Sequence, residues 1–199
     1  REVDPVQNLA HHTVRQKPKW CLSPFIQEGM VNLLYGDGKS GKSLLALAIM
    51  VSIQTGIDYL GRKPETQHVG LYLDWEDDVA THGERLGQLN IEVEPPDIHY
   101  RRMYGTLAEQ AEVLHKLIDE LHVGFVVVDS AALACGSEPE KAEPAIRLYN
   151  AMRSWGVTVL LVAHTNKEGK LYGNVQWRNQ SRNSWEAIKQ QEPGEDSLQ

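Results

Sequence analysis

Apolar residues fall along the chain in short runs that alternate with longer amphipathic segments. Most of the runs are nearly continuous and end in polar or acidic residues. They are VNLLY (31–35), HVGLYLDWE (68–76), IHYRRM (98–103), GFVVVDS (124–130) and VTVLLVAHT (157–165). Because strands this apolar have no face suited to water, the pattern is typical of a parallel sheet that is covered on both sides.

Four segments between these runs carry apolar residues at helical spacing. They are KSLLALAIMVSIQTG (42–56), DDVATHGERLGQLNI (77–91), TLAEQAEVLHKLIDELH (106–122) and PAIRLYNAMRSWG (144–156). End signals support them: Gly56 suits a helix C-terminus, Asp77 or Asp78 favours an N-terminus, and Thr106 with Glu109 forms a capping box. The alternation predicts an α/β fold, with a mostly parallel twisted sheet flanked by helices on both faces.

The remaining segments have weaker patterns. Residues 20–30 are predicted to be an apolar, proline-containing approach to the first strand, and residues 132–143 and 166–180 to be loops. NSWEAIKQQ (183–191) is predicted as a further strand, with a helix as the alternative. QEPGED (191–196) after it is typical of a hairpin turn, so we expect antiparallel strands toward the C-terminus.

Composition then excludes some classes of protein. At 199 residues, 41% hydrophobic and 24% charged, the chain fits one domain with a sizeable core. No apolar run approaches the roughly 18 residues that span a bilayer, and no secretion signal opens the chain. We therefore expect a cytoplasmic protein without a membrane partner. Cys21 and Cys135 lie far apart and are expected to be reduced, apolar residues.

Charge and the chain ends add two expectations. The net charge of −7, from 20 basic and 27 acidic side chains, argues against a protein that coats nucleic acid by bulk electrostatics. Residues 163–182 are nevertheless locally basic. Because the chain begins without an initiator Met and stops soon after a predicted turn, we expect a fragment. Its parts would be a loosely ordered lead-in (1–19) and one domain (20–199) truncated at the C-terminus.

The stretch GDGKSGKS (36–43) follows the first predicted strand and leads into the first predicted helix. It fits the phosphate-binding pattern G-x-x-x-x-G-K-[ST], and the strand–turn–helix context also fits. Backbone N–H groups of such a P-loop point at phosphate oxygens, the lysine reaches the β- and γ-phosphates and the serine binds Mg²⁺. A glycine-rich hinge is the alternative. The expected nucleotide contacts are Gly36, Asp37, Gly38, Lys39, Ser40, Gly41, Lys42, Ser43 and Leu44.

Two further strands end in acids that suit such a site. Asp129 ends VVVD and is expected to join Ser43 in binding Mg²⁺, because open α/β sheets place ligands at the carboxyl ends of their strands; capping of the next helix is the alternative. Glu76 lies just beyond LYLDW, where its carboxylate can polarise a water for attack. Asp74 or Asp77 are alternatives for that role.

His164 ends the strand VLLVA and is expected at the same sheet edge. A polar group there can respond to the γ-phosphate and pass that state to the loop that follows, although a structural histidine is the alternative. Lys167 in that loop is expected either to contact the same phosphate or to be solvated.

These motifs, in this order, resemble the RecA-like P-loop ATPases. The approach WCLSPFIQEGMVNLLYGDGKSGKSLLAL and the strand ends LYLDWEDD, VVVDS and VAHTNK are most similar to the AAA_25 branch that contains the hexameric replicative helicase RepA of plasmids, with DnaB-type helicases as more distant relatives. The segment GNVQWRNQSRNSW (173–185) is similar to the Gly-to-Arg-to-Trp segment of that branch. The resemblance covers about residues 20–199 and implies a RecA-like fold.

The resemblance also implies roles and partners. ATP with Mg²⁺ would bind between subunits of a homo-oligomer, most simply a hexameric ring, with Glu76 as catalytic carboxylate and His164 as γ-phosphate sensor. Arg182 would be an arginine finger reaching the neighbouring subunit's site, with a surface arginine on a strand edge as the alternative. Arg178 is the alternate finger.

The loop from Thr165 to Trp177 corresponds to the segment that family members project into a central channel. Single-stranded DNA would contact basic and aromatic residues there, with a solvated loop and a core tryptophan as the alternative. The expected DNA contacts are Lys167, Lys170, Trp177 and Arg178, with Tyr172 as a further candidate. We therefore expect an ATPase motor, a replicative helicase of a mobile element or phage. The alternatives are a filament-forming recombination ATPase or a regulatory ATPase that binds proteins.

Overall fold

The computed structural model describes residues 6, 8, 17–58, 61–89, 97–136, 140–166, 171 and 176–190. Most of the lead-in expected over residues 1–19, and the C-terminal residues 191–199 with their predicted hairpin turn, lie outside these ranges.

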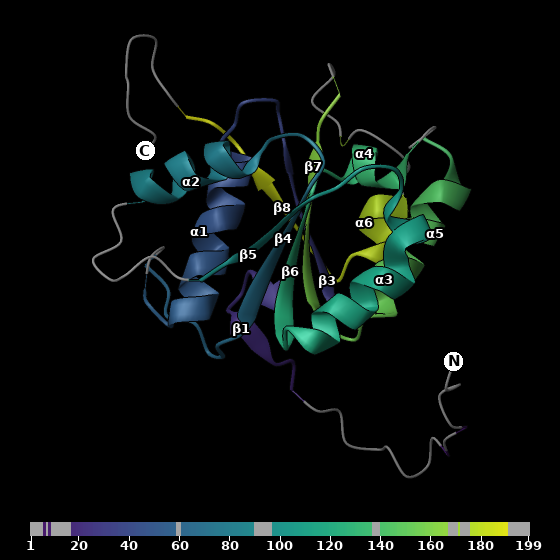
Figure 1. Cartoon of the computed structure of the whole chain (residues 1–199), viewed down its shortest axis with the longest axis horizontal. Helices are drawn as coiled ribbons and strands as arrows, with labels where there is room; N and C mark the ends of the chain where they lie inside the picture. Colours follow the sequence, from purple (N-terminus) through teal and green to yellow (C-terminus); the bar gives the residue numbers. More distant parts are fainter. Residues whose placement is uncertain are drawn as a thin grey trace.

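A six-stranded sheet forms the centre of the molecule, with strand order β5-β4-β6-β7-β3-β8 (Figure 1). Its strands are β5 (His99–Arg102), β4 (Val69–Asp74), β6 (Val123–Asp129), β7 (Thr158–His164), β3 (Val31–Gly36) and β8 (Asn183–Ala187). Every neighbouring pair is parallel. All the carboxyl ends therefore meet at one edge of the sheet, which we call the carboxyl edge, and all the starts meet at the opposite, amino edge.

Strand β8 is parallel to β3, and the antiparallel strands expected toward the C-terminus depend on the hairpin turn predicted after β8, which lies outside the described residues. The chain crosses back over the sheet through α6 (Gln176–Gln180) before it enters β8. Such a crossover returns the chain to the amino edge, so β8 pairs with β3 in the parallel sense. Antiparallel pairing among the described residues is limited to a bridge between Thr165 and Leu171 and to the hairpin of β1 (Trp20–Leu22) and β2 (Ile26–Gln27).

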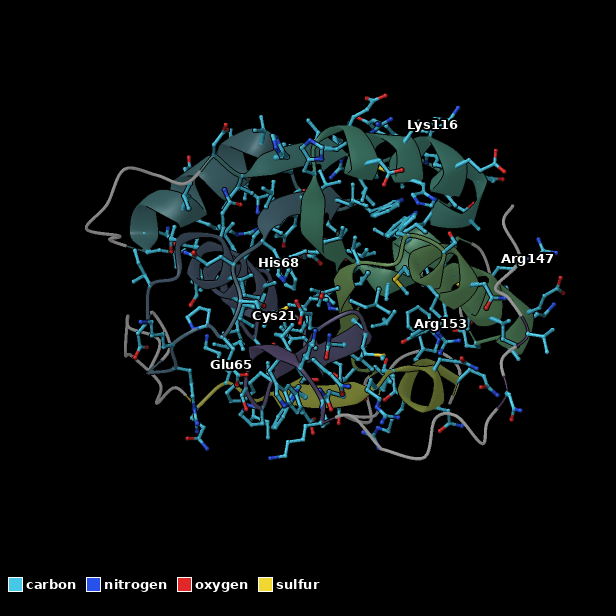
Figure 2. The ribbon with its side chains drawn as sticks, turned by 90° about the horizontal axis from the view of Figure 1, so that it is seen from below. Cys21, Glu65, His68, Lys116, Arg147 and Arg153 are labelled. Atoms are coloured by element: carbon cyan, nitrogen blue, oxygen red, sulfur yellow. The ribbon has the colours of Figure 1, made fainter. Side chains whose placement is uncertain are left out.

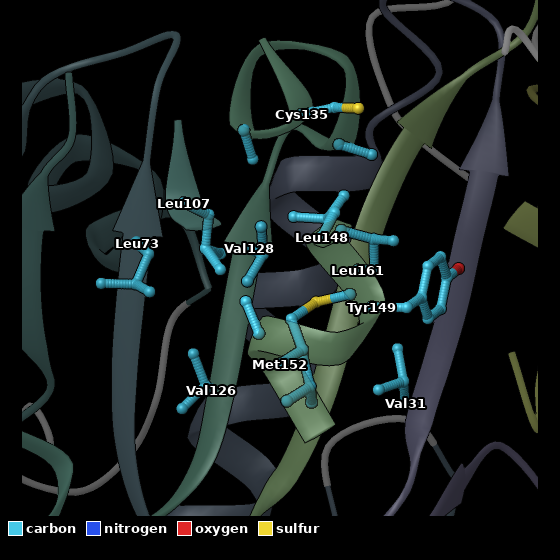
Figure 3. Packing of buried hydrophobic residues seen from close by; sticks show 14 of the residues in the cluster. Val31, Leu73, Leu107, Val126, Val128, Cys135, Leu148, Tyr149, Met152 and Leu161 are labelled. Carbon is cyan, nitrogen blue, oxygen red and sulfur yellow. The ribbon is translucent and has the colours of Figure 1, made fainter. Parts of the chain in front are cut away.

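Helices cover both faces of the sheet, as the alternating pattern predicts (Figure 1). One face carries α1 (Lys42–Thr55) and α2 (Val79–Gln88), and the other carries α3 (Leu107–Glu120), α4 (Ala131–Cys135), α5 (Ala142–Arg153) and α6. The strands contribute side chains to a core on each face. In the core shown in Figure 3, Val126, Val128 and Leu161 of the sheet pack against Leu148 and Met152 of α5.

Local signals in the sequence fix several helix ends. Thr106 and Glu109 form the predicted capping box of α3, and the Asp78 side chain accepts a hydrogen bond from the N–H of Thr81 at the start of α2. Helix α1 ends at Gly56, whose φ of 75° is the left-handed conformation that glycine adopts without strain.

Three short elements were not predicted. The β1–β2 hairpin lies in the expected approach segment, α4 in the expected loop 132–143, and α6 in the expected loop 166–180. Helix α4 consists of Ala131, Ala132, Leu133, Ala134 and Cys135, and alanine and leucine form helix readily. Ala131, Ala134 and Cys135 are buried, and α4 lies against α3 and α5, so packing decides an element too short for a periodic signal. Among the helices that the structure describes, none is long and apolar enough to cross a membrane.

Candidate functional site

The predicted P-loop connects the carboxyl end of β3 to the first turn of α1. Lys39 and Gly41 have φ values of 63° and 82°, so the loop curls through left-handed backbone conformations. Gly41 precedes α1 and no side chain caps that helix, which leaves its first N–H groups without a side-chain acceptor. Glycine is required at position 36, because a Cβ there would lie 2.4 Å from the carbonyl oxygen of Ala187. The loop thus has the form of an anion cradle.

Lys42 lies inside this curl. Its side chain is 4% exposed, and Nζ donates hydrogen bonds to the backbone oxygen of Asp37 at 2.6 Å and to Ser40 Oγ at 3.4 Å. Burial lowers the pKa of Lys42, and the carboxylates of Asp129 and Glu76 oppose that shift. The Lys42 ammonium group is therefore held where phosphate oxygens would lie over the loop. The carboxylates of Asp129 and Glu76 lie near enough to act on its charge.

Asp129 lies at the carboxyl end of β6, two strands from the P-loop strand. It is 3% exposed and accepts a 2.7 Å hydrogen bond from the Tyr72 hydroxyl. Burial raises the pKa of Asp129, and hydrogen bonds from Tyr72 and Ser43 oppose the rise. The Ser43 hydroxyl and the Asp129 carboxylate therefore face each other. A hydroxyl and a buried carboxylate are hard oxygen ligands, so this pair fits Mg²⁺.

Glu76 follows β4 and contacts residues at the carboxyl ends of β6 and β7. Its carboxylate accepts a hydrogen bond from the Ser130 hydroxyl, which follows β6, and Oε1 lies 3.0 Å from Nε2 of His164 at the end of β7. The hydrogen bond from His164 lowers the pKa of Glu76, burial opposes this, and Ser130 adds to the lowering. Glu76 is thus an ionised carboxylate, about one third exposed, that faces the space beside Lys42.

Asp74 and Asp77, the alternatives to Glu76, have other partners. Asp74 is 1% exposed and accepts hydrogen bonds from the N–H groups of Glu76 and Asp77 at 2.8 and 3.1 Å. Burial alone would raise the pKa of Asp74, but its hydrogen bonds from His82, these N–H groups and Tyr100 outweigh burial and lower the pKa to about 2. Asp77 is paired with Arg85 at 2.6 Å. Asp74 therefore shapes the turn that presents Glu76.

The end of β7 is attached to the P-loop itself. His164 is in register with Gly36, and the N–H of Thr165 donates to the Gly36 oxygen at 3.0 Å. The Thr165 hydroxyl also donates to the Asp37 carboxylate. A displacement of the loop would therefore be transmitted to the chain that follows β7.

Arg182 lies on the other side of the molecule. It immediately precedes β8, its backbone N–H donates to the Val31 oxygen at 2.9 Å, and its side chain is exposed at the amino edge. Strand β3 separates this position from the P-loop, and its length of six residues corresponds to about 16 Å. Arg182 and the P-loop of one chain are therefore not brought together.

The residues expected to contact DNA differ in where the structure places them. Lys167, Lys170 and Tyr172 lie outside the described residues. Trp177 is 0% exposed, and its backbone oxygen accepts a 2.7 Å hydrogen bond from the buried Tyr149 hydroxyl. The Trp177 ring is therefore not accessible for base stacking in this structure, and its burial agrees with the alternative of a core tryptophan.

Arg178 is exposed but has an aromatic partner in its own chain. Its Nη2 donates to the Tyr35 hydroxyl at 2.5 Å, and its guanidinium lies 5.3 Å from the centre of the Tyr35 ring. Tyr35 directly precedes the P-loop. This contact places Arg178 nearer to its own loop than Arg182 is.

Three residues that contribute to the site were not predicted from the sequence. Ser130 and Thr165 each follow a residue that was singled out, so the signal was a second polar residue directly after a strand-ending acid or histidine. Tyr72 had no such signal, because a tyrosine within an apolar strand is indistinguishable from a core residue until its hydroxyl is found beside Asp129.

Comparisons with known proteins identify the family and the fold of this chain. A family model described as an AAA domain matches residues 3–170. The structure is similar to the crystal structure of a KaiC-like protein from the hyperthermophilic archaeon Pyrococcus horikoshii, with a TM-score of 0.61 and 15% sequence identity over 88% of this chain and 78% of that one. The sequence has no significant match among curated proteins.

Proposed function

The chain belongs to the AAA domain family AAA_25, and we propose that it is a cytoplasmic, ATP-hydrolysing motor domain that acts on single-stranded DNA. Its fold is RecA-like, which agrees with the fold that the motifs predict. The more specific proposal is a replicative helicase of a mobile element or phage, with ATP bound at the interfaces of a homo-oligomer such as a hexameric ring.

The convergence of Lys42, the Ser43–Asp129 pair, Glu76 and His164 at the carboxyl edge supports hydrolysis more than any other observation. The P-loop N–H groups and Lys42 would bind the phosphates, and Ser43 with Asp129 would hold Mg²⁺. When bound, Mg²⁺ would neutralise negative charge that develops on the phosphate oxygens during hydrolysis. These residues together would form a binding site for a nucleoside triphosphate.

Glu76 would orient the attacking water. Its hydrogen bonds with His164 and Ser130 fix the carboxylate, and its lowered pKa keeps it ionised at neutral pH. A carboxylate with a low pKa is a weak base, so we assign it to orienting and polarising the water more than to removing its proton early. His164 would sense the γ-phosphate through this same hydrogen bond.

Replacing Glu76 with glutamine should retain ATP binding and lower hydrolysis by roughly 10²–10⁴-fold, the usual contribution of a positioned acid–base group. Glutamine keeps the shape and the hydrogen bonds to Ser130 and His164 and removes only the charge. Asp77→Asn is the matched control, because this neighbouring acid is paired with Arg85, and its hydrolysis should stay near that of the wild type. Equal loss in both variants, or loss in Asp77→Asn alone, would reassign the role.

DNA-stimulated hydrolysis tests the motor function. ATP hydrolysis by the assembled protein should rise several-fold with single-stranded DNA and much less with duplex DNA of the same sequence. The stimulation should weaken as salt is raised, because phosphate contacts release counterions. Electron microscopy of the same sample distinguishes a closed ring from the filament of a recombination ATPase.

A regulatory ATPase that binds proteins is the second candidate. Two observations favour it: the net charge of −7 and the burial of Trp177, which removes one of the two aromatic side chains expected to contact a base. Hydrolysis that is indifferent to every DNA tested, in a protein that still binds and hydrolyses ATP, would favour this candidate over the motor.

A further inference from the structure

A cluster of metal-ligating side chains lies at the amino edge of the sheet, away from the nucleotide site. Cys21 belongs to β1, Glu28 follows β2 and His68 precedes β4. Their ligand atoms, one thiol sulfur, one carboxylate oxygen and one imidazole nitrogen, all lie within 4.8 Å of one another. Figure 2 views the molecule from this side and shows Cys21 and His68 close together.

The backbone around the cluster is fixed by hydrogen bonds. The N–H of Glu28 donates to the Lys19 oxygen at 3.0 Å, which closes the β1–β2 hairpin around Cys21. The N–H of Glu65 donates to the Cys21 oxygen at 2.9 Å, which brings the chain before β4 against β1. The two segments that carry the ligands are thus joined independently of any ion.

His68 is also held in place. Its Nε2 lies 3.1 Å from Glu28 Oε1 and 3.1 Å from the Thr66 hydroxyl. Its ring packs on Gly124 of β6, where a Cβ would lie 2.4 Å from Nδ1. Only glycine at position 124 leaves room for the imidazole in this position, so the approach of His68 to Cys21 depends on three separate segments.

We propose that Cys21, Glu28 and His68 form a site for Zn²⁺ or a similar divalent transition metal. Sulfur, nitrogen and oxygen ligands of this kind are the set that Zn²⁺ accepts, and three protein ligands with an open fourth position make a common Zn²⁺ arrangement. A thiolate and a carboxylate balance the charge of the ion. Cys21 is 0% exposed, whereas His68 and Glu28 are about one quarter exposed, so an ion would enter from their side.

The distances require only a small adjustment. Metal–ligand bonds of about 2.0–2.3 Å place tetrahedral ligand atoms about 3.3–3.8 Å apart. A contraction of about 1 Å in the widest pair, by rotation of the partly exposed Glu28 and His68 side chains, completes the geometry. Such an ion would fasten the N-terminal hairpin to the start of β4 and so stabilise the fold.

The two cysteines of the chain provide the experiment. Cys135→Ser leaves Cys21 as the single thiol, so any thiolate signal in that variant belongs to the proposed site. The nucleotide-free variant, stripped with a chelator and kept reduced with a phosphine, is titrated with Co²⁺. We expect a thiolate-to-cobalt charge-transfer band that saturates at one Co²⁺ per chain and is abolished by stoichiometric Zn²⁺. Wild-type protein should give the same titration.

Substitutions of Cys21, Glu28 and His68 test whether each of them is a ligand of the metal. Cys21→Ser in the Cys135→Ser background should lose the band. Glu28→Gln and His68→Gln should each weaken Zn²⁺ affinity by at least the roughly 10–100-fold that loss of an outer-shell partner produces. Zn²⁺ should raise the unfolding temperature of Cys135→Ser and leave that of the double cysteine variant unchanged, with circular dichroism verifying the fold of each.

Two results would overturn the proposal. The first is the absence of the band in folded Cys135→Ser protein. The second is a band that neither Glu28→Gln nor His68→Gln alters, which would mean adventitious binding to an isolated thiol. Either result would leave the cluster as a His–Glu pair beside a buried cysteine.

Discussion

Replacing Lys42 with alanine is expected to abolish ATP binding and, with it, measurable hydrolysis. The side chain is buried in the curl of the P-loop, with Nζ held by the Asp37 oxygen and Ser40. Alanine removes the cation that would lie against the phosphates and leaves the acids behind it, Asp129 and Glu76, without a counter-charge. Binding of a fluorescent ATP analogue and release of phosphate are the two measurements.

Lys116→Ala is the matched control for this variant. Lys116 is an exposed lysine on α3, on the face of the sheet opposite α1, and its loss should change neither measurement. Because Lys42 also bonds to its own loop, circular dichroism and thermal unfolding should verify that the variant is folded. Folded Lys42→Ala protein that binds ATP as tightly as the wild type would refute the central assignment.

Arg182→Ala is expected to lower hydrolysis in the assembled protein by roughly 10³–10⁵-fold, as loss of an arginine finger does. Since Arg182 lies at the amino edge of its own sheet, any action on ATP must be on another chain. Two inactive variants should then complement each other. Lys42→Ala and Arg182→Ala subunits, mixed in equal amounts before assembly, should recover about a quarter of wild-type activity, because one random interface in four pairs an intact P-loop with an intact arginine.

Arg178→Ala serves as the comparison, since Arg178 is the alternate finger and is bonded to Tyr35 of its own chain. If Arg178→Ala were inactive and complemented Lys42→Ala while Arg182→Ala stayed active, the finger would move to Arg178. A mixture of Lys42→Ala and Arg182→Ala that remains inactive in properly assembled oligomers would remove the finger role from Arg182.

Much of the sheet could be predicted because its strands are continuous apolar runs that end in polar residues. The runs before Gly36, Asp74, Asp129 and His164 each became a strand, and parallel pairing then brought these four ends to one edge. The P-loop was predictable for a further reason: its function depends on a fixed spacing of glycine, lysine and serine along the chain.

Side-chain directions near the strand ends could not be predicted in the same way. Asp74 and Glu76 are both acids two positions apart, and only the turn after β4 separates their roles. Asp74 folds inward to bind the N–H groups of that turn, and Glu76 is left facing His164. Such a turn depends on contacts with His82 and Tyr100 from other elements, which no local pattern contains.

Trp177 shows a related limit. A tryptophan among polar and basic residues matches both a DNA-binding loop and a short buried helix. The difference comes from Tyr149 of α5, whose hydroxyl lies beneath α6. Tyr149 is 28 positions earlier in the chain, so this contact has no local signature.

The separation of Arg182 from the P-loop, at opposite edges of a wholly parallel sheet, has a consequence for how activity depends on assembly size. If each ATP site needs both, subunits must join head to tail through a heterologous interface, which either closes into a ring or stays open. An open chain always has one incomplete site at an end, whereas a closed ring has none. Hydrolysis per subunit would therefore increase with the length of an open assembly, and in a closed ring it would be constant because every site is complete.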